Sequence, residues 1–241
     1  MKALLLNSGV GRRMGPMENH CKCLLPVLGE RTILDLQLAA LEHCGIEEVV
    51  ITTGPFEQIL MDHVGQRFPH LKVRYVHNPL YETTNYIYSI YMARELLEGE
   101  ELVLMHGDLV FQRDILESLL SGDKSRVVVD STLPLPEKDF KAVIQEGKVK
   151  KIGIEFFDNA AAAQPLYYLR SEDWGIWLEE IVRFCQEKNT GVYAENALNL
   201  RTEEMDLGVL DIQGRLCMEV DNEEDLQHVR SMILGKERSF S

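Results

Sequence analysis

Two glycines and two arginines follow the first apolar run of the chain, and they are the residues with the clearest chemistry. Residues 7–14 read Asn-Ser-Gly-Val-Gly-Arg-Arg-Met, and Lys22 follows eleven residues after Gly11. Glycines let the backbone approach a ligand closely, and successive N–H groups of such a turn can hold a phosphate. Arginine and lysine supply the positive charge that suits a phosphate. The segment therefore predicts a phosphate-binding turn, with a tight turn and solvated arginines as the alternative.

The turn differs from two common phosphate-binding signatures. The dinucleotide fingerprint needs a third glycine where Met14 stands. The P-loop needs Gly-Lys followed by Ser or Thr, which the segment lacks. What remains is Gly-x-Gly followed by two arginines.

Two aspartates, Asp108 and Asp221, follow predicted strands at 102–105 and 216–220. Ligands of open parallel sheets collect at the carboxyl ends of the strands, and Mg²⁺ prefers oxygen ligands such as carboxylates. Each aspartate alone is equally typical of a helix N-cap. The residues by themselves leave both interpretations open.

The elements that must position these residues alternate along the first half of the chain. Buried strands are predicted near 4–6, 49–51, 73–75, 102–105 and 127–129, and helices over 33–44, 56–64, 86–98 and 115–119. Thr32 is expected to cap the first of these helices and Gly45 to end it. This alternation predicts an α/β fold with a Rossmann-like, mostly parallel (mixed) sheet and helices on both faces.

The pattern changes after residue 131. Residues 140–155 predict a hairpin with its turn at Gly147, and Ser171 is a candidate cap for a helix. Two short strands at 209–212 and 216–220 and a final helix near 223–234 complete the prediction.

Composition excludes several classes of protein. The chain of 241 residues carries 25 Lys and Arg against 39 Asp and Glu, a formal net charge of −14, which nucleic acid and anionic membranes would repel. Five sparse cysteines do not indicate a disulfide framework. The N-terminal apolar stretch is too short for a signal peptide, and no apolar run reaches the length of a membrane span. We expect a cytoplasmic protein with no nucleic-acid partner and no membrane insertion, and leave a homodimer open.

The glycine turn resembles the opening signature of nucleotidylyltransferases of the sugar-phosphate and phosphocholine type. Their usual form is roughly L-A-A-G-x-G-x-R-(L/M), then a spacer, a lysine, a short apolar run and a glycine. Gly9, Gly11, Arg13 and Lys22 match in order and spacing. This chain departs by having Asn7-Ser8 for the commoner Ala-Ala and Cys21 where a proline often precedes the lysine.

The resemblance implies the roles of these residues. Arg13 and Lys22 would be catalytic. Asp108 and Asp221 match the family's two metal aspartates, so Mg²⁺ is the expected cofactor. The residues expected to bind the nucleotide at the turn are Asn7, Ser8, Gly9 and Gly11.

It also implies the organisation of the chain: one nucleotidyltransferase domain of GT-A-like type over residues 1–241. Residues 1–130 would form the nucleotide-binding part and 131–206 the acceptor-binding part. Residues 207–241 would supply the return strands and the C-terminal helix.

Residues 78–92 resemble a segment of bacterial phosphocholine cytidylyltransferases in which an N-x-x-x-S pattern opens a helix. Here the pair is Asn85 and Ser89, which the resemblance assigns to nucleotide binding. Hexose-phosphate members usually have a Gly-Thr-Ala helix opening, which is absent at this place. The comparison favours cytidylyl transfer.

The acceptor pocket is expected in residues 131–206. A choline-like cation would favour aromatic faces and a carboxylate, which makes Tyr168, Tyr193 and Glu195 the candidates. Trp174 and Trp177 lie three residues apart on an amphipathic helix and are expected to pack in the core.

We therefore expect a Mg²⁺-dependent enzyme that transfers CMP from CTP to a small phospho-alcohol or phosphonate and releases pyrophosphate. Phosphocholine, phosphoethanolamine, 2-aminoethylphosphonate and polyol phosphates all remain open as acceptors. One alternative is a hexose-1-phosphate nucleotidyltransferase that uses UTP or dTTP. Another is a non-catalytic regulatory module that binds a nucleotide.

Overall fold

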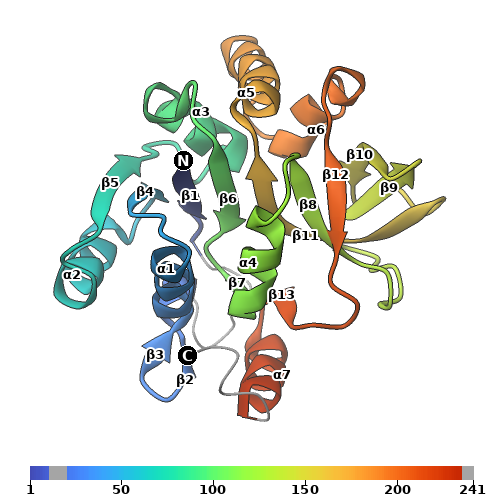
Figure 1. Ribbon diagram of the computed structural model, residues 1–241. Helices are drawn as coiled ribbons and strands as arrows, with labels where there is room; N and C mark the ends of the chain where they lie inside the picture. The colour runs from blue at the N-terminus through green and yellow to red at the C-terminus, as the bar shows by residue number, and fades with distance from the viewer. Residues whose placement is uncertain (11–20, 235–241) are drawn as a thin grey trace.

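The computed structural model describes residues 1–10 and 21–234. A nine-stranded mixed sheet runs through it in the order β5-β4-β1-β6-β11-β8-β12-β10-β9 (Figure 1). This sheet takes strands from all three of the segments that the sequence distinguishes, 1–130, 131–206 and 207–241. The α/β prediction with a mixed sheet is confirmed.

Four parallel strands form the first half of the sheet, as predicted. Three of them are short apolar runs whose side chains are mostly buried from both faces, which is typical of parallel sheets covered by helices. They are β1 (Lys2–Asn7), β4 (Glu48–Thr53) and β6 (Leu102–His106). The fourth, β5 (Lys72–His77), lies at the edge of the sheet and is only partly buried.

An antiparallel strand, β11 (Ala160–Leu169), lies between β6 and β8 (Arg126–Asp130). No sequence pattern predicts β11, because an alanine run and an internal proline are both uncommon in strands. Pro165 lies where the register against β8 shifts, between Gln164 and Tyr167. The irregularity accommodates a residue that has no N–H to donate.

The remaining strands of the sheet include the predicted hairpin. It consists of β9 (Lys141–Gln145) and β10 (Lys148–Gly153), and β12 (Gly208–Asp211) runs parallel to β8. Glu146 and Gly147 have φ angles of 53° and 76°. A two-residue hairpin turn with both angles positive matches the twist of its strands, and the predicted turn at Gly147 is confirmed.

Helices cover both faces of the sheet, and alternate residues of β1 point to the two cores. Leu4 belongs to the core under α3 (Tyr86–Leu97), α5 (Ser171–Gln186) and α6 (Ala194–Leu198). Its neighbour Leu5 belongs to the core on the other face. The helices of that second face are α1 (Ile33–His43), α2 (Glu57–Arg67) and α4 (Arg113–Leu120).

Three local predictions about the helices have different outcomes. Thr32 caps α1 in a reciprocal capping box with Asp35, as expected. The cap at Ser171 is wrong by one position: Arg170 is the N-cap of α5 and makes no side-chain capping bond. Trp174 and Trp177 are fully buried in the core, and their ring N–H groups donate to the carbonyl oxygens of Leu97 and Ala194.

Seven further elements complete the described part of the chain. The sequence patterns predict β13 and α7 but none of the other short elements. They are η2 (Lys22–Leu24), β2 (Pro26–Leu28), β3 (Arg31–Thr32), β7 (Leu109–Phe111), η3 (Thr202–Glu204), β13 (Cys217–Glu219) and α7 (Glu223–Leu234).

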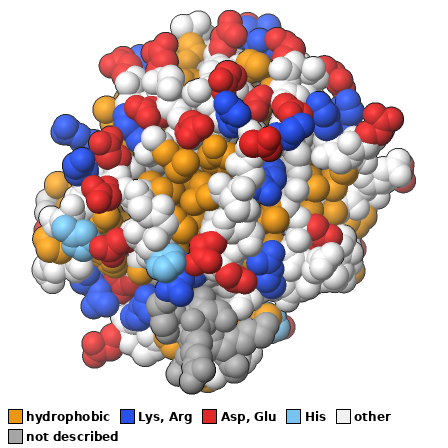
Figure 2. Space-filling model, viewed as in Figure 1, with side chains coloured by type: hydrophobic (Ala, Val, Ile, Leu, Met, Phe, Trp, Pro, Cys, Tyr) orange, Lys and Arg blue, Asp and Glu red, His pale blue; other side chains and the backbone are white. Residues whose placement is uncertain are grey.

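Acidic and basic side chains are interspersed over the face shown in Figure 2, around a group of hydrophobic side chains near the middle. Within residues 1–10 and 21–234, no helix is long and apolar enough to cross a membrane. The expectations of a cytoplasmic location and of a homodimer stay predictions.

Candidate functional site

A cleft of about 460 Å³ opens beside the carboxyl ends of β1, β5 and β6. Residues from several distant parts of the chain line it. They include residues 6–10, 21–23 and 106–108, seven residues from the β5–α3 loop and the start of α3, residues 138–140, Tyr193, Glu219 and Asp221. This is the edge of an open α/β sheet at which ligands are expected to bind.

Three of the predicted site residues meet in this cleft. The ammonium nitrogen of Lys22 lies 3.1 Å from Asp108 Oδ2 and 2.6 Å from Asp221 Oδ1. Burial alone would lower the pKa of Lys22, but the two carboxylates outweigh it and raise the pKa above its ordinary value. Lys22 therefore carries its positive charge between two carboxylates.

The pairing of β13 with β7 explains how Asp221 reaches Asp108. These strands are antiparallel, with Glu219 opposite Leu109, and the N–H of Val220 donates to the carbonyl oxygen of Asp108 at 2.9 Å. This register places the end of β13 beside the turn that carries Asp108. Two acids far apart in sequence thereby face one point.

The oxygen donors of this point suit a divalent cation. Asp108 and Asp221 each direct a carboxylate oxygen to the same ammonium group, so both can reach one cation. Hard cations such as Mg²⁺ prefer oxygen ligands of this kind. The two predicted metal ligands therefore fit the cofactor that the sequence implies.

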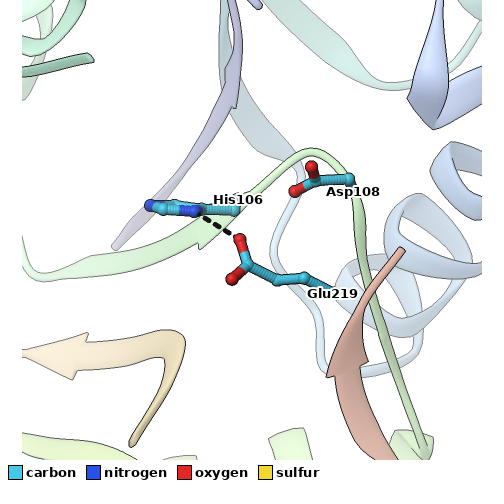
Figure 3. Close-up of side chains that lie close together, drawn as sticks. All are labelled: His106, Asp108 and Glu219. Carbon is cyan, nitrogen blue, oxygen red and sulfur yellow. Dashed lines mark hydrogen bonds and ion pairs between the residues drawn. The ribbon is translucent and has the colours of Figure 1, made fainter. Parts of the chain in front are cut away.

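A histidine and a third acid lie next to these residues. His106 Nδ1 lies 2.8 Å from Glu219 Oε1 (Figure 3). His106, Asp108 and Glu219 each offer one atom that could bind a metal ion, and these three atoms lie within 4.8 Å of one another. Burial opposes protonation of His106, but the hydrogen bond and charge of Glu219, with the charge of Asp108, raise its pKa to about 9. His106 thus offsets part of the negative charge of the cluster.

Asn7 and Gly107 are in close contact at the end of β1. A Cβ atom at Gly107 would lie 1.9 Å from Asn7 Oδ1, so only glycine fits there without a shift. The buried Nδ2 of Asn7, on the wall of the cleft, has no hydrogen-bond partner within the described part of the chain. It is a donor available to a ligand, in keeping with the predicted nucleotide contact.

Ser8 and Ser89 connect the glycine turn to α3. Ser89 Oγ donates to Ser8 Oγ at 2.9 Å and accepts from the side chain of Asn78 at 3.0 Å. Asn85 caps α3, since its side chain accepts from the N–H of Tyr86 at 2.8 Å. All of these residues line the cleft. Their predicted nucleotide contacts stay predictions, as does that of Gly9, which lines the same cleft.

Two of the three predicted acceptor residues do not lie on the cleft wall. The hydroxyl group of Tyr168 donates to Glu101, and its ring packs in the core under α1 and α4. Adjacent strand residues point to opposite faces of the sheet, so Tyr168 points away from the face to which Tyr167 belongs. Glu195 is only 1% exposed and accepts hydrogen bonds from Tyr167 at 2.9 Å and from Tyr86. Both carboxylate oxygens of Glu195 therefore hold tyrosines in place.

Tyr193 lines the cleft, as the third acceptor prediction requires. Its ring centre lies 5.0 Å from that of Phe140, in an edge-to-face arrangement, and 5.9 Å from that of Tyr86. Tyr86 in turn packs edge-on against His106 at 4.8 Å. These rings form an aromatic wall that leads to the acidic cluster.

Gly11 and Arg13 lie outside the described residues, so their predicted roles stay predictions.

Gln37, Tyr86 and Glu219 are not among the site residues predicted from the sequence. Glu219 had a usable signal, since it precedes Asp221 by two positions and strand side chains repeat with a period of two. Gln37 had none. It lies in the middle of α1, yet its side-chain N–H group donates to the carbonyl oxygens of His106 and Leu109, both at 2.8 Å. It therefore clamps the turn that carries Asp108.

Comparison with known proteins gives a family match over most of the chain. The model of the MobA-like NTP transferase domain matches residues 3–146. CMP-5'-(3-aminopropyl)phosphonate synthase of Streptomyces rubellomurinus is 35% identical over 132 residues, which are 54% of this chain and 21% of that protein. The chain thus matches about a fifth of the length of that relative.

Two full-length similarities extend this match. Choline-phosphate cytidylyltransferase of Streptococcus pneumoniae is 23% identical over 245 residues, covering 97% of this chain and 98% of that protein. The solved structure of the inositol-1-phosphate CTP transferase from T. maritima superposes with a TM-score of 0.78 at 20% identity, covering 98% of this chain and 96% of that one. The second similarity shows a shared fold.

Proposed function

The chain belongs to the family of MobA-like NTP transferase domains, and from this premise we propose that it transfers CMP from CTP to a small phospho-alcohol or phosphonate, with release of pyrophosphate. The observation that carries the proposal is the meeting of Lys22, Asp108 and Asp221 in one cleft. The choice of CTP is supported by the two relatives, whose names refer to CMP and to cytidylyl transfer.

Asp108 and Asp221 would hold the divalent ion, and Mg²⁺ is the ion that their carboxylate oxygens suit. When bound, such an ion neutralises phosphate charge and orients the reacting groups. His106 and Glu219, which are hydrogen-bonded to each other beside Asp108, would help to hold this ligand in position.

The residues of the chain supply binding, orientation and charge. The acceptor oxygen of a phosphate or phosphonate is already anionic, so its attack on the α-phosphorus needs no general base. The Gly9 backbone and the Asn7 Nδ2 group would donate to the nucleotide, while the Lys22 ammonium would offset charge on the α-phosphate and on departing pyrophosphate. Arg13 would share the role of Lys22.

The acceptor would carry a positively charged amine. The aromatic wall of Tyr86, Phe140 and Tyr193 offers ring faces, and Glu82 and Asp139 also line the cleft. Aromatic faces and carboxylates attract organic ammonium groups. The names of both relatives include a group with a positively charged nitrogen, the ammonium of aminopropylphosphonate and the quaternary ammonium of choline phosphate.

A screen of nucleotides and acceptors tests this proposal. The full chain is incubated with Mg²⁺, one of CTP, UTP, dTTP or ATP, and one acceptor of each class, and pyrophosphate release is measured. We expect release with CTP and an amine-bearing phosphate or phosphonate. Release only with UTP or dTTP and a hexose phosphate would favour the sugar enzyme, and no release with any pair would contradict the proposal.

A further inference from the structure

Two cysteine thiols flank Lys22 in the cleft. Cys21 Sγ and Cys23 Sγ lie 3.4 Å apart, within contact distance of each other. Cys21 is half-buried and Cys23 is buried, and both line the cleft. The lysine between them is the residue that reaches both Asp108 and Asp221. No step of the proposed transfer uses either thiol.

The short η2 turn holds these two sulfurs on the same side of the chain. The N–H of Leu24 donates to the carbonyl oxygen of Cys21 at 3.0 Å, and the N–H of Leu25 donates to that of Lys22 at 3.0 Å. A disulfide bond is about 2.05 Å long, so the sulfurs must approach by about 1.4 Å to form one. The bond would enclose the backbone of Lys22 in a small ring, and that ring would constrain the shape of the turn.

The two thiols differ in pKa, and the difference favours thiol–disulfide exchange that starts at Cys21. The hydrogen bond with Cys23 outweighs burial and lowers the pKa of Cys21, while burial raises the pKa of Cys23. By contrast, burial raises the pKa of Cys185 to about 11 and also raises that of Cys217. Cys21 is both reachable and the better nucleophile, with Cys23 in place to resolve a mixed disulfide.

We propose that Cys21 and Cys23 form a reversible disulfide with each other, by exchange with a small-molecule disulfide such as oxidised glutathione. This bond inactivates the site by moving Lys22. The Cys21 thiolate attacks one sulfur of the oxidant and displaces one thiolate. The Cys23 sulfur, losing its proton to solvent, then attacks Cys21 Sγ and displaces the second. Two electrons pass from the protein thiols to the oxidant, which leaves as two thiols.

The consequence for the site follows from the contacts of Lys22. Its ammonium group contacts carboxylates at 3.1 and 2.6 Å, and an η2 turn that the disulfide holds in another shape would draw the group away from them. The pairing of the thiols is independent of the proposed function, whereas the loss of turnover rests on it. Loss of a single preorganised donor typically costs about 100-fold or more in rate.

A tryptic peptide map tests the pairing without any activity. Trypsin cleaves after Lys22, so reduced and alkylated protein gives separate peptides 14–22 and 23–31, each with one cysteine. After treatment of the full chain with oxidised glutathione, we expect these peptides to remain linked until dithiothreitol is added. Separate peptides, or glutathione retained on Cys21, would overturn the pairing.

Turnover with CTP tests the switch. We expect oxidised glutathione to lower the wild-type rate about 100-fold and dithiothreitol to restore it. The turnover of Cys21→Ser and Cys23→Ser should not fall with oxidised glutathione. The turnover of Cys44→Ser, the matched control, should fall as that of the wild type does. Cys23→Ala replaces Cys23→Ser if the latter does not fold. Linked peptides with unchanged turnover would overturn the switch, and a chain without turnover in either state would instead count against the proposed function.

Discussion

The ammonium nitrogen of Lys22 lies 2.6 Å from a carboxylate oxygen of Asp221, although 199 positions separate the two residues in the sequence. The same nitrogen reaches Asp108, 86 positions away, at 3.1 Å. The fold thus brings an early turn, a central strand end and a late strand to one point.

Replacing Lys22 with alanine removes the positive charge from this point. We expect Lys22→Ala to keep its fold and to lower turnover with CTP about 100-fold or more, because a preorganised donor to the reacting phosphates is lost. Pyrophosphate release measures the rate, and circular dichroism checks the fold. Lys124→Ala is the control, since Lys124 is exposed and pairs with Asp206. Wild-type turnover in Lys22→Ala would reject its role.

Replacing Asp108 with asparagine weakens the proposed metal site. We expect Asp108→Asn to need much more Mg²⁺ for turnover, or to lose turnover, since one of two carboxylate ligands is gone. The fold should survive, because the change removes a negative charge close to Glu219. Turnover is measured against Mg²⁺ concentration, with Asp114→Asn on α4 as the control. An unchanged Mg²⁺ requirement would remove Asp108 from the site.

Gln37 should act as a positioning residue. Gln37→Leu leaves the carbonyl oxygens of His106 and Leu109 without their buried donor, which costs about 1–3 kcal/mol of folding free energy. We also expect kcat to fall while KM for CTP changes little, because the turn that carries Asp108 is loosened. Urea unfolding and steady-state kinetics measure the two effects. Gln58→Leu, on the exposed face of α2, is the control, and equal effects of the two changes would refute the clamp.

Tyr86 should support Glu195 through its hydroxyl group. Tyr86→Phe keeps the ring on the cleft wall but deprives a buried carboxylate of one donor, so we expect a loss of about 1–3 kcal/mol in the free energy of unfolding. Tyr81→Phe, which changes another ring of the same cleft, should have a smaller effect. A stability equal to that of the wild type would show that Glu195 does not depend on Tyr86.

Asp35 should make stability depend on pH in the acid range. Burial acts to raise its pKa, but the N–H of Thr32 and the contacts with His63 and Arg67 outweigh burial and hold the pKa below its ordinary value of 3.8. A depressed folded-state pKa adds stability above the unfolded value, and that stability is lost as pH falls through the folded value.

Asp35→Asn should therefore unfold more easily than the wild type at pH 7, and the difference should narrow below a pH of about 4. Urea unfolding at a series of pH values measures it. Asp62→Asn, an exposed change on α2, should show a much smaller difference at every pH. A difference that stays constant down to pH 3 would contradict the assignment to the Asp35 charge.

The main strands and helices of the first half could be predicted, because most of these strands are short apolar runs between turn residues and the helices have amphipathic spacing. β11 could not, since Ala160–Ala163 and Pro165 give no strand signal, and its place depends on pairing with β6 and β8. The one-residue error at the start of α5 has a local origin. Arg170 occupies the N-cap position without a capping side chain, which no propensity favours.

Site residues that belong to a sequence motif could be predicted, whereas those whose position depends on tertiary contacts could not. Lys22, Asp108 and Asp221 stood in recognisable places. Residue type alone favours Tyr168 and Glu195 as acceptor contacts. The alternation of side chains along β11 directs Tyr168 to the face away from the cleft, and two tyrosines donate hydrogen bonds to Glu195. Such outcomes depend on contacts between distant segments.

The most direct test of the central claim is a crystal structure of the chain with CTP and Mn²⁺, an ion that replaces Mg²⁺ and gives an anomalous signal. We predict one anomalous peak at about 2.0–2.5 Å from carboxylate oxygens of both Asp108 and Asp221, with the triphosphate beside Lys22. A triphosphate bound elsewhere, or a metal that contacts neither aspartate, would contradict the account.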